Sequence, residues 1–137
     1  MSYLDLQAMA AWENPALTGN FASIRASIQA HEYLRASLLI LPCCLFYPIL
    51  EEGIFRGMLF EAFLRTNRSR FLSIILVSGL FALMHLTSRL EVLPVLDLFL
   101  LGLVLSWLTL RSASLIPAVV LHSAFNAMAV AVQARLF

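Results

Sequence analysis

Four long apolar segments run through most of this sequence, and they constrain its fold more than any other feature. The segments are 36–64, 71–88, 92–110 and 114–134. Each is close to or above the ~20 residues that a helix needs to cross the hydrocarbon core of a bilayer. With 61% hydrophobic and 12% charged residues, the chain also has the composition of an integral membrane protein. We therefore predict an all-α, polytopic membrane bundle of about four transmembrane helices.

The region before these segments, residues 1–35, has an amphipathic pattern. Its side chains on one helical face are Phe21, Ile24, Ile28, His31 and Leu34. The charged residues of this region fall elsewhere on the helix, which is typical of a helix lying at the membrane interface. Asn20 is the expected N-cap. We divide the chain into this interfacial region, 1–35, and a membrane core, 36–137.

Two further features concern the first long segment, 36–64. It is longer than one crossing requires and contains Pro42 and Pro48, so we expect a kink or a break just before Glu51. The adjacent cysteines, Cys43 and Cys44, lie in an apolar run and are interpreted as buried thiols.

The basic residues argue against a nucleic-acid partner. All nine are arginines, they are scattered, and the formal net charge is only +1. The loop containing Arg65, Arg68 and Arg70 is the strongest positive-inside signal, and Arg111 belongs to the same side. Because four other arginines fall on the opposite side, the orientation in the membrane stays open.

Polar residues interrupt three of the apolar segments. They are Glu51, Glu52, Arg56, His85, His122 and Asn126. At ~1.5 Å per helical residue, Glu51, both histidines and Asn126 lie roughly 16 to 22 Å from the arginine at one end of their helices, so three helices share one polar layer. A charge in hydrocarbon costs at least ~2.5–3.5 kcal/mol, so such residues face the bundle interior and are candidates for function.

Each of these residues also has a simpler explanation. Glu52 and Arg56 are four residues apart and can form a buried structural ion pair. Either histidine can be a packing residue, and Asn126 can hydrogen-bond between helices. In combination, however, two carboxylates, two imidazoles and an amide suit hydrolysis. A carboxylate beside a histidine can activate water, and an imidazole with an amide N–H can stabilise an oxyanion.

Two residues near this layer are not assigned to the site. Asp97 lies at a similar depth but has no partner at helical spacing, so it is left open between a helix contact and a supporting group. Phe81 is four residues before His85 and is expected to be a core side chain.

Three motifs in this order resemble a known family. The stretches EEGIFR, FALMH and HSAFN fit EExxxR, FxxxH and HxxxN. These are the motifs of the CPBP intramembrane proteases, which include CAAX prenyl endopeptidases and bacteriocin-processing or immunity proteins of the Abi type. The resemblance implies that segment 36–137 is an intramembrane protease core.

The resemblance also implies roles for the six residues. In a glutamic-type endopeptidase of this family, Glu51 and His85 would activate water, and His122 and Asn126 would form the oxyanion hole. Glu52 and Arg56 match residues needed for activity, to which we assign a positioning role. No cofactor is expected on this mechanism. The alternative is a zinc ion held by Glu51, His85 and His122.

The expected substrate is a peptide bond in a membrane-embedded or membrane-adjacent segment, such as the C-terminal tail of an exported or sorted protein. The expected location is a bacterial inner (cytoplasmic) membrane. Family members commonly have extra helices before the EExxxR segment. Here either the interfacial region closes the bundle, or a second copy, making a homo-oligomer, or another protein covers the exposed side.

Two other classes of function compete with the protease. The first is a non-catalytic binding or immunity membrane protein of the same fold, for which an unchanged phenotype in Glu51→Gln would be evidence. The second is a proton or ion pathway, since membrane transporters also use chains of Glu, His and Asp. Four short helices without inverted repeats argue against the second class.

Overall fold

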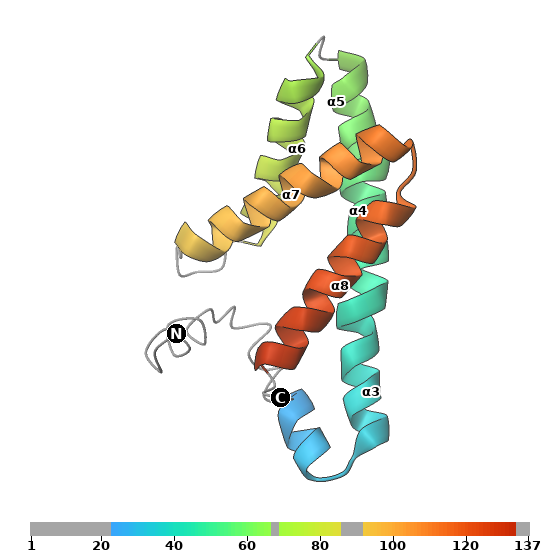
Figure 1. The fold of residues 1–137 in the computed structure, drawn as a ribbon, viewed down its shortest axis with the longest axis vertical. Coiled ribbons are helices and arrows are strands. Elements are labelled where there is room, and N and C mark those ends of the chain that lie inside the picture. Colours follow the sequence, from blue (N-terminus) through green and yellow to red (C-terminus); the bar gives the residue numbers. More distant parts are fainter. Residues whose placement is uncertain (1–22, 67–68, 86–91, 134–137) are drawn as a thin grey trace.

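The computed structural model describes residues 23–66, 69–85 and 92–133. Within these ranges the protein is helical and contains no strand (Figure 1). Six α-helices and two π-helical segments follow one another, after a short helical stretch at 23–29. They are α3 (Tyr33–Leu41), η1 (Pro42–Phe46), α4 (Tyr47–Glu52), η2 (Gly53–Leu59), α5 (Phe60–Thr66), α6 (Arg70–Met84), α7 (Val92–Ser112) and α8 (Ile116–Gln133). The predicted all-α class is therefore confirmed.

The first five elements form one continuous helix of 34 residues, Tyr33–Thr66, which runs from α3 to α5 along one side of Figure 1. The expected break before Glu51 does not occur. Instead, Pro42 opens the π-helical segment η1, where the N–H of Tyr47 donates to the carbonyl of Pro42 five residues earlier. The wider turn lets the helix continue past both prolines. At ~1.5 Å per residue, the helix is about 51 Å long.

The remaining helices pack around the upper and middle parts of this long helix. Helix α6 packs against α5 and η2, α7 crosses α6, and α8 lies beside α4 and η1 (Figure 1). Their shared core is a cluster of apolar side chains, formed by Phe55, Phe60, Val77, Phe81, Leu101, Leu105 and Ala118. This core lies directly beside the polar residues of Glu51–Arg56, so it fixes the helices that carry them.

The N-terminal amphipathic pattern folds differently from the expectation. The helical stretch ends at residue 29, and His31 adopts a left-handed backbone conformation with φ of 60°. A second helix, α3, then begins at Tyr33, so the pattern predicted as one helix is divided between two. Ile24 is fully buried and forms a cluster with Val130 of α8. The predicted N-cap, Asn20, lies outside the described residues.

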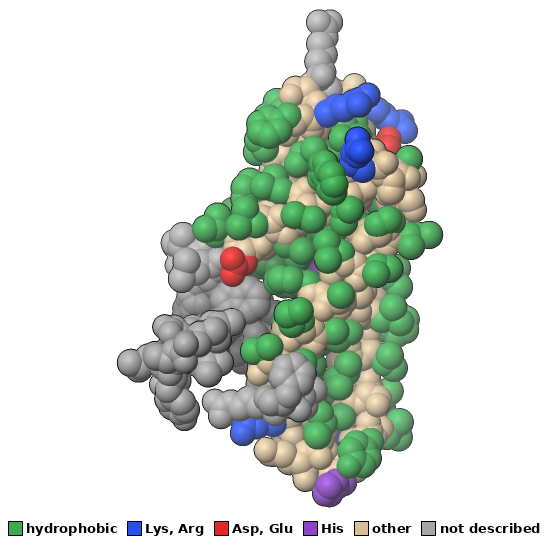
Figure 2. Space-filling model, viewed as in Figure 1, with side chains coloured by type: hydrophobic (Ala, Val, Ile, Leu, Met, Phe, Trp, Pro, Cys, Tyr) green, Lys and Arg blue, Asp and Glu red, His purple; other side chains and the backbone are tan. Residues whose placement is uncertain are grey.

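The outer surface is strongly apolar. Large hydrophobic side chains are exposed along all the long helices, and they cover the face shown in Figure 2. Two helices, Tyr33–Thr66 and Val95–Ser112, are long and apolar enough to cross a membrane, and only 22% of each apolar window is buried. The core helix of a soluble protein would be mostly buried. The apolar helices Arg70–Met84 and Ile116–Val132 are shorter, so the number of four spans stays a prediction.

Candidate active site

Glu52 is the centre of a buried polar cluster. Its side chain has no exposed surface, and it projects from the last turn of α4. One carboxylate oxygen, Oε1, accepts hydrogen bonds from Arg56 Nη1 at 3.0 Å and from His122 Nδ1 at 2.9 Å. The arginine compensates the charge of the carboxylate, and the histidine joins α8 to the long helix. Glu52 therefore links two elements that are far apart in the sequence.

Arg56 is held by more than its ion pair with Glu52. Its Nη2 donates to the main-chain carbonyl of Gly102 on α7 at 3.2 Å. The guanidinium carbon also lies 4.6 Å from the centroid of the Phe81 ring, within the range of a cation–π interaction. The arginine is buried on all sides, with 1% of its surface exposed. Three different helical elements thus hold this one cation.

Glu51 lies in a more open environment than its neighbour. Its Oε2 atom is 3.6 Å from His122 Nε2 and 3.9 Å from His85 Nε2. The Glu51 side chain is 31% exposed and that of His85 is 24% exposed, whereas His122 is 3% exposed. Glu51 and His85 are therefore partly accessible to solvent, and the Glu51 carboxylate lies beside two imidazole nitrogens at separations slightly longer than a hydrogen bond.

Hydrogen bonds fix which ring nitrogen of each histidine faces Glu51. The Nδ1 of His85 is 2.8 Å from the carbonyl of Phe81, and a carbonyl can only accept, so this nitrogen carries a proton. The Nδ1 of His122 likewise donates to the Glu52 carboxylate. In both rings the Nε2 atom is the one that remains free for chemistry.

Asn126 lies on α8 one turn beyond His122, but its hydrogen bond is to the main chain. Its Nδ2 donates to the carbonyl of Cys43 at 2.9 Å. That carbonyl lacks a donor within its own helix. The N–H of Tyr47 is engaged with Pro42, and Pro48 has no N–H. Asn126 therefore satisfies a carbonyl that η1 and Pro48 leave free, and its second amide N–H stays available.

Three groups that contact this cluster were not predicted from the sequence: two main-chain carbonyls and one aromatic ring. The carbonyls of Gly102 and Cys43 gave no signal, because a motif records side chains only. Phe81 is a core residue, as predicted, but its ring also contacts site residues. Its centroid lies 4.8 Å from that of His85 and 5.5 Å from that of His122. The Phe of the FxxxH motif was the sequence feature that could have indicated these ring contacts.

Within the described part of the chain, Asp97 makes no hydrogen bond or ion pair with the cluster. It is exposed on the surface of α7, one and a half turns before Gly102. Cys43 is buried and Cys44 is half-buried, and both are free thiols. The predicted buried thiol is found at position 43, while Cys44 borders the smaller cluster around Val130.

The alternative zinc site would consist of Glu51, His85 and His122. In the ranges that the structure describes, no three His, Cys, Asp or Glu side chains are arranged to hold a metal ion. Glu51, His85 and His122 lie near one another but do not form such a group as placed.

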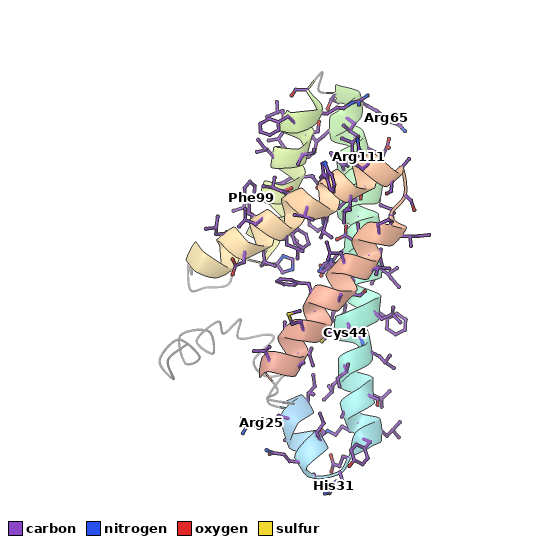
Figure 3. The ribbon with its side chains drawn as sticks, in the orientation of Figure 1. Arg25, His31, Cys44, Arg65, Phe99 and Arg111 are labelled. Atoms are coloured by element: carbon purple, nitrogen blue, oxygen red, sulfur yellow. The ribbon has the colours of Figure 1, made fainter. Side chains whose placement is uncertain are left out.

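Figure 3 shows the surroundings of the cluster. Arg65 and Arg111 lie together at one end of the bundle, and Arg25 and His31 lie at the other end. The acidic pair Glu51–Glu52 lies between these ends, 16 residues after Arg35 and 14 residues before Arg65. Along the helix axis these intervals correspond to about 24 Å and about 21 Å. The cluster is therefore close to the midpoint of the bundle.

The comparisons with known proteins give one match. Residues 34–128 match the family described as type II CAAX prenyl endopeptidase Rce1-like, which is more than half of the chain and contains all three motifs. No curated protein and no solved structure matches. The match confirms the family resemblance that the motifs predict, and the family implies a membrane-associated protease with a peptide substrate. The chain belongs to the Rce1-like family of type II CAAX prenyl endopeptidases.

Proposed function

We propose that this protein is an intramembrane endopeptidase of glutamic type, in which Glu51 is the general base. The observation that carries the proposal is the position of Glu51 Oε2, 3.6 Å and 3.9 Å from two imidazole Nε2 atoms. The partial exposure of Glu51 gives water access to it. The fully buried Glu52 accepts a hydrogen bond from His122 Nδ1, which holds that ring in place.

In the proposed reaction, Glu51 and His85 bind a water molecule, and the carboxylate takes one of its protons. The resulting hydroxide attacks the carbonyl carbon of the substrate, and the tetrahedral intermediate carries a negative oxygen. The intermediate then collapses as the C–N bond breaks, and the proton held by Glu51 passes to the leaving amine. General-base assistance of this kind contributes about 10²–10⁴-fold to the rate.

The proposed oxyanion hole consists of His122 and Asn126. Because His122 Nδ1 already donates to Glu52, its Nε2 can donate to the oxyanion only when the ring is protonated. Asn126 contributes its second amide N–H, since the first is bonded to the carbonyl of Cys43. Donors aimed at a developing oxyanion each contribute about 2.7–4 kcal/mol.

The proposed substrate is a hydrophobic peptide segment, such as the C-terminal tail of an exported or sorted protein in a bacterial inner membrane. The apolar exterior supports lateral contact with lipid and with such a segment. We also propose that α6 and α8 cross the membrane together with the two longer helices. The polar cluster would then lie between four spans, with Arg65 and Arg111 at one membrane surface.

The test is cleavage of candidate tail peptides by the purified protein in detergent. Glu51→Gln keeps the shape of the side chain and removes the base, so we expect at least a ~100-fold loss of cleavage with the fold intact. Glu61→Gln is the matched control, because Glu61 is exposed on α5 and pairs with Arg65, away from the polar cluster.

Each arm is run with and without a strong chelator. Cleavage that persists in chelator and disappears in Glu51→Gln supports the glutamic mechanism, whereas loss in chelator identifies a metal-dependent enzyme. If folded wild-type protein cleaves no peptide in a broad screen, the function is binding rather than hydrolysis. Peptide binding that is unchanged in Glu51→Gln would then identify the non-catalytic alternative.

A further inference from the structure

We infer that the main-chain carbonyl of Gly102, on α7, is a positioning group for the proposed active site. It acts through Arg56, and its location is set by the close contact of Gly102 with Ser78 on α6. This inference rests on the proposed function and extends it to two residues that lie outside the three motifs. Gly102 is buried, and Ser78 has no exposed surface.

A continuous series of hydrogen bonds connects this carbonyl to the site. Gly102 O accepts from Arg56 Nη2 at 3.2 Å, and Arg56 Nη1 donates to Glu52 Oε1 at 3.0 Å. The same Oε1 accepts from His122 Nδ1 at 2.9 Å. His122 Nε2 then faces Glu51 Oε2 at 3.6 Å. A displacement of the first group is therefore passed to the imidazole that borders Glu51.

Arg56 has few other polar anchors. Its Nε atom is buried and has no hydrogen-bond partner in the described part of the chain. The Phe81 ring supports the flat face of the guanidinium but does not fix its rotation in the plane. The pair of contacts to Glu52 and to Gly102 therefore defines where the guanidinium lies. Without the carbonyl, the guanidinium would keep one of these two hydrogen bonds, the one to Glu52 Oε1.

The position of the carbonyl depends on the absence of a side chain at residue 102. A Cβ atom built there would lie 3.0 Å from Ser78 Cβ and 3.1 Å from Ser78 Cα. These separations are shorter than ordinary van der Waals contact, so α7 could not stay as close to α6 with alanine at this position. The hydroxyl of Ser106 also donates to Gly102 O at 2.8 Å, which gives this carbonyl a second donor.

The other glycine on these two helices, Gly79, lacks this constraint and provides a matched control. A Cβ at Gly79 of α6 would have no heavy atom within 4 Å. Gly79→Ala therefore adds the same methyl group, one residue after Ser78, without displacing α7. Ser78→Gly removes the Cβ and the hydroxyl that a methyl at 102 would meet, so it should partly rescue Gly102→Ala.

The experiment compares wild type, Gly79→Ala, Gly102→Ala and the double variant Gly102→Ala/Ser78→Gly. Two quantities are measured in the full chain in detergent. The first is the ¹⁵N chemical shift of the His122 ring, assigned with His122→Gln, with His31 and His85 as the other two ring signals. The second is peptide cleavage, with kcat and KM determined separately.

We expect Gly102→Ala to shift the His122 Nδ1 resonance and to lower kcat about 10- to 100-fold with KM unchanged. Gly79→Ala should match wild type in both quantities, and the double variant should recover most of both. If Gly102→Ala does not fold, Ser106→Ala replaces it, because it removes a bond to the same carbonyl without steric conflict. It should shift His122 in the same direction by a smaller amount.

The two measurements separate this inference from the proposed function. An unmoved His122 resonance in folded Gly102→Ala overturns the positioning role, whatever the cleavage result. A loss of kcat that Ser78→Gly does not relieve also overturns it. If no variant, including wild type, cleaves a peptide but the His122 resonance responds as expected, the positioning role holds and the protease assignment fails.

Discussion

Glu51 and Glu52 are adjacent in the sequence, yet they lie in two regions of the molecule with opposite properties. Glu52 has no exposed surface, and one of its oxygens accepts hydrogen bonds from two donors at 3.0 Å and 2.9 Å. Glu51 is 31% exposed, and its nearest ionic partner in the described part of the chain is His122 Nε2 at 3.6 Å. A helix rotates about 100° per residue, so neighbouring side chains face different surroundings.

We therefore expect the buried region (Glu52, Arg56, His122) to position the site and the open region (Glu51, His85) to exchange a proton. A carboxylate with tightly bound donors is a good support but a poor base, because its charge is already shared. A carboxylate with loosely placed imidazoles and access to water is free to exchange a proton. The following predictions test whether the two regions differ in this way.

The largest effect is expected when the buried region loses its cation. Arg56→Met leaves Glu52 buried and without its positive partner, which should lower the free energy of unfolding by about 3–5 kcal/mol. The matched control is Arg65→Met. Arg65 pairs with Glu61 at the same spacing in the same long helix, but both side chains are exposed, so we expect about 0–1 kcal/mol. Reversible unfolding in detergent measures both changes.

Equal losses in the two variants would contradict the proposed contrast between buried and exposed pairs. Glu51→Gln sharpens the comparison from the other side, because it removes a charge that has no close partner. Its free energy of unfolding should stay at or above the wild-type value, even though its activity is lost.

A change in the open region should reduce activity without reducing stability. His85→Gln removes the imidazole that faces Glu51 from α6, and cleavage should fall by about 100-fold or more. The unfolding transition should stay close to that of wild type, because His85 is partly exposed. His31→Gln, in the turn before α3, is the control for the loss of a histidine. Retained cleavage in His85→Gln would remove this residue from the proposed mechanism.

The smallest effect concerns the bond between Asn126 and the carbonyl of Cys43. Asn126→Leu leaves this carbonyl without a donor, which should cost about 1–3 kcal/mol of unfolding free energy. The cost should be lower in a Pro48→Ala background, because alanine supplies an N–H five residues after Cys43. Thermal unfolding of the four proteins of this double-mutant cycle measures the coupling.

Equal costs of Asn126→Leu in the two backgrounds would show that Asn126 does not compensate for Pro48. The cleavage rates of the same proteins provide a second comparison. If the amide of Asn126 also stabilises an oxyanion, its loss lowers activity equally in both backgrounds.

The spacing of side chains in the sequence predicted much of the cluster. Residues four apart in a helix share a face, and Glu52 and Arg56 form the ion pair that this rule predicts. The similar depths of Glu51, His85 and His122 in their segments likewise predicted a shared layer, and the structure places the three side chains together. Both results follow from the regular geometry of helices.

The rest depends on contacts that helical geometry does not fix. The bond between His122 and Glu52 joins residues 70 positions apart, so it depends on how α8 packs beside α4. The π-helical segment at Pro42 follows from how the long helix accommodates its prolines, which a pattern of apolar residues does not record. The turn at His31 was missed because a histidine with positive φ has no reliable sequence signal.

The central position of Glu51 along the long helix has a consequence for substrate length. The helix spans about 45 Å from Arg35 to Arg65, which equals the thickness of a bilayer with its headgroups. A tail that enters from the Arg65 end must cover about 21 Å to reach Glu51. At ~3.3–3.6 Å per residue this takes about six extended residues, or about fourteen if the tail is helical. In the proposed protease, the depth of this carboxylate would set the length of the shortest tail that can be cleaved.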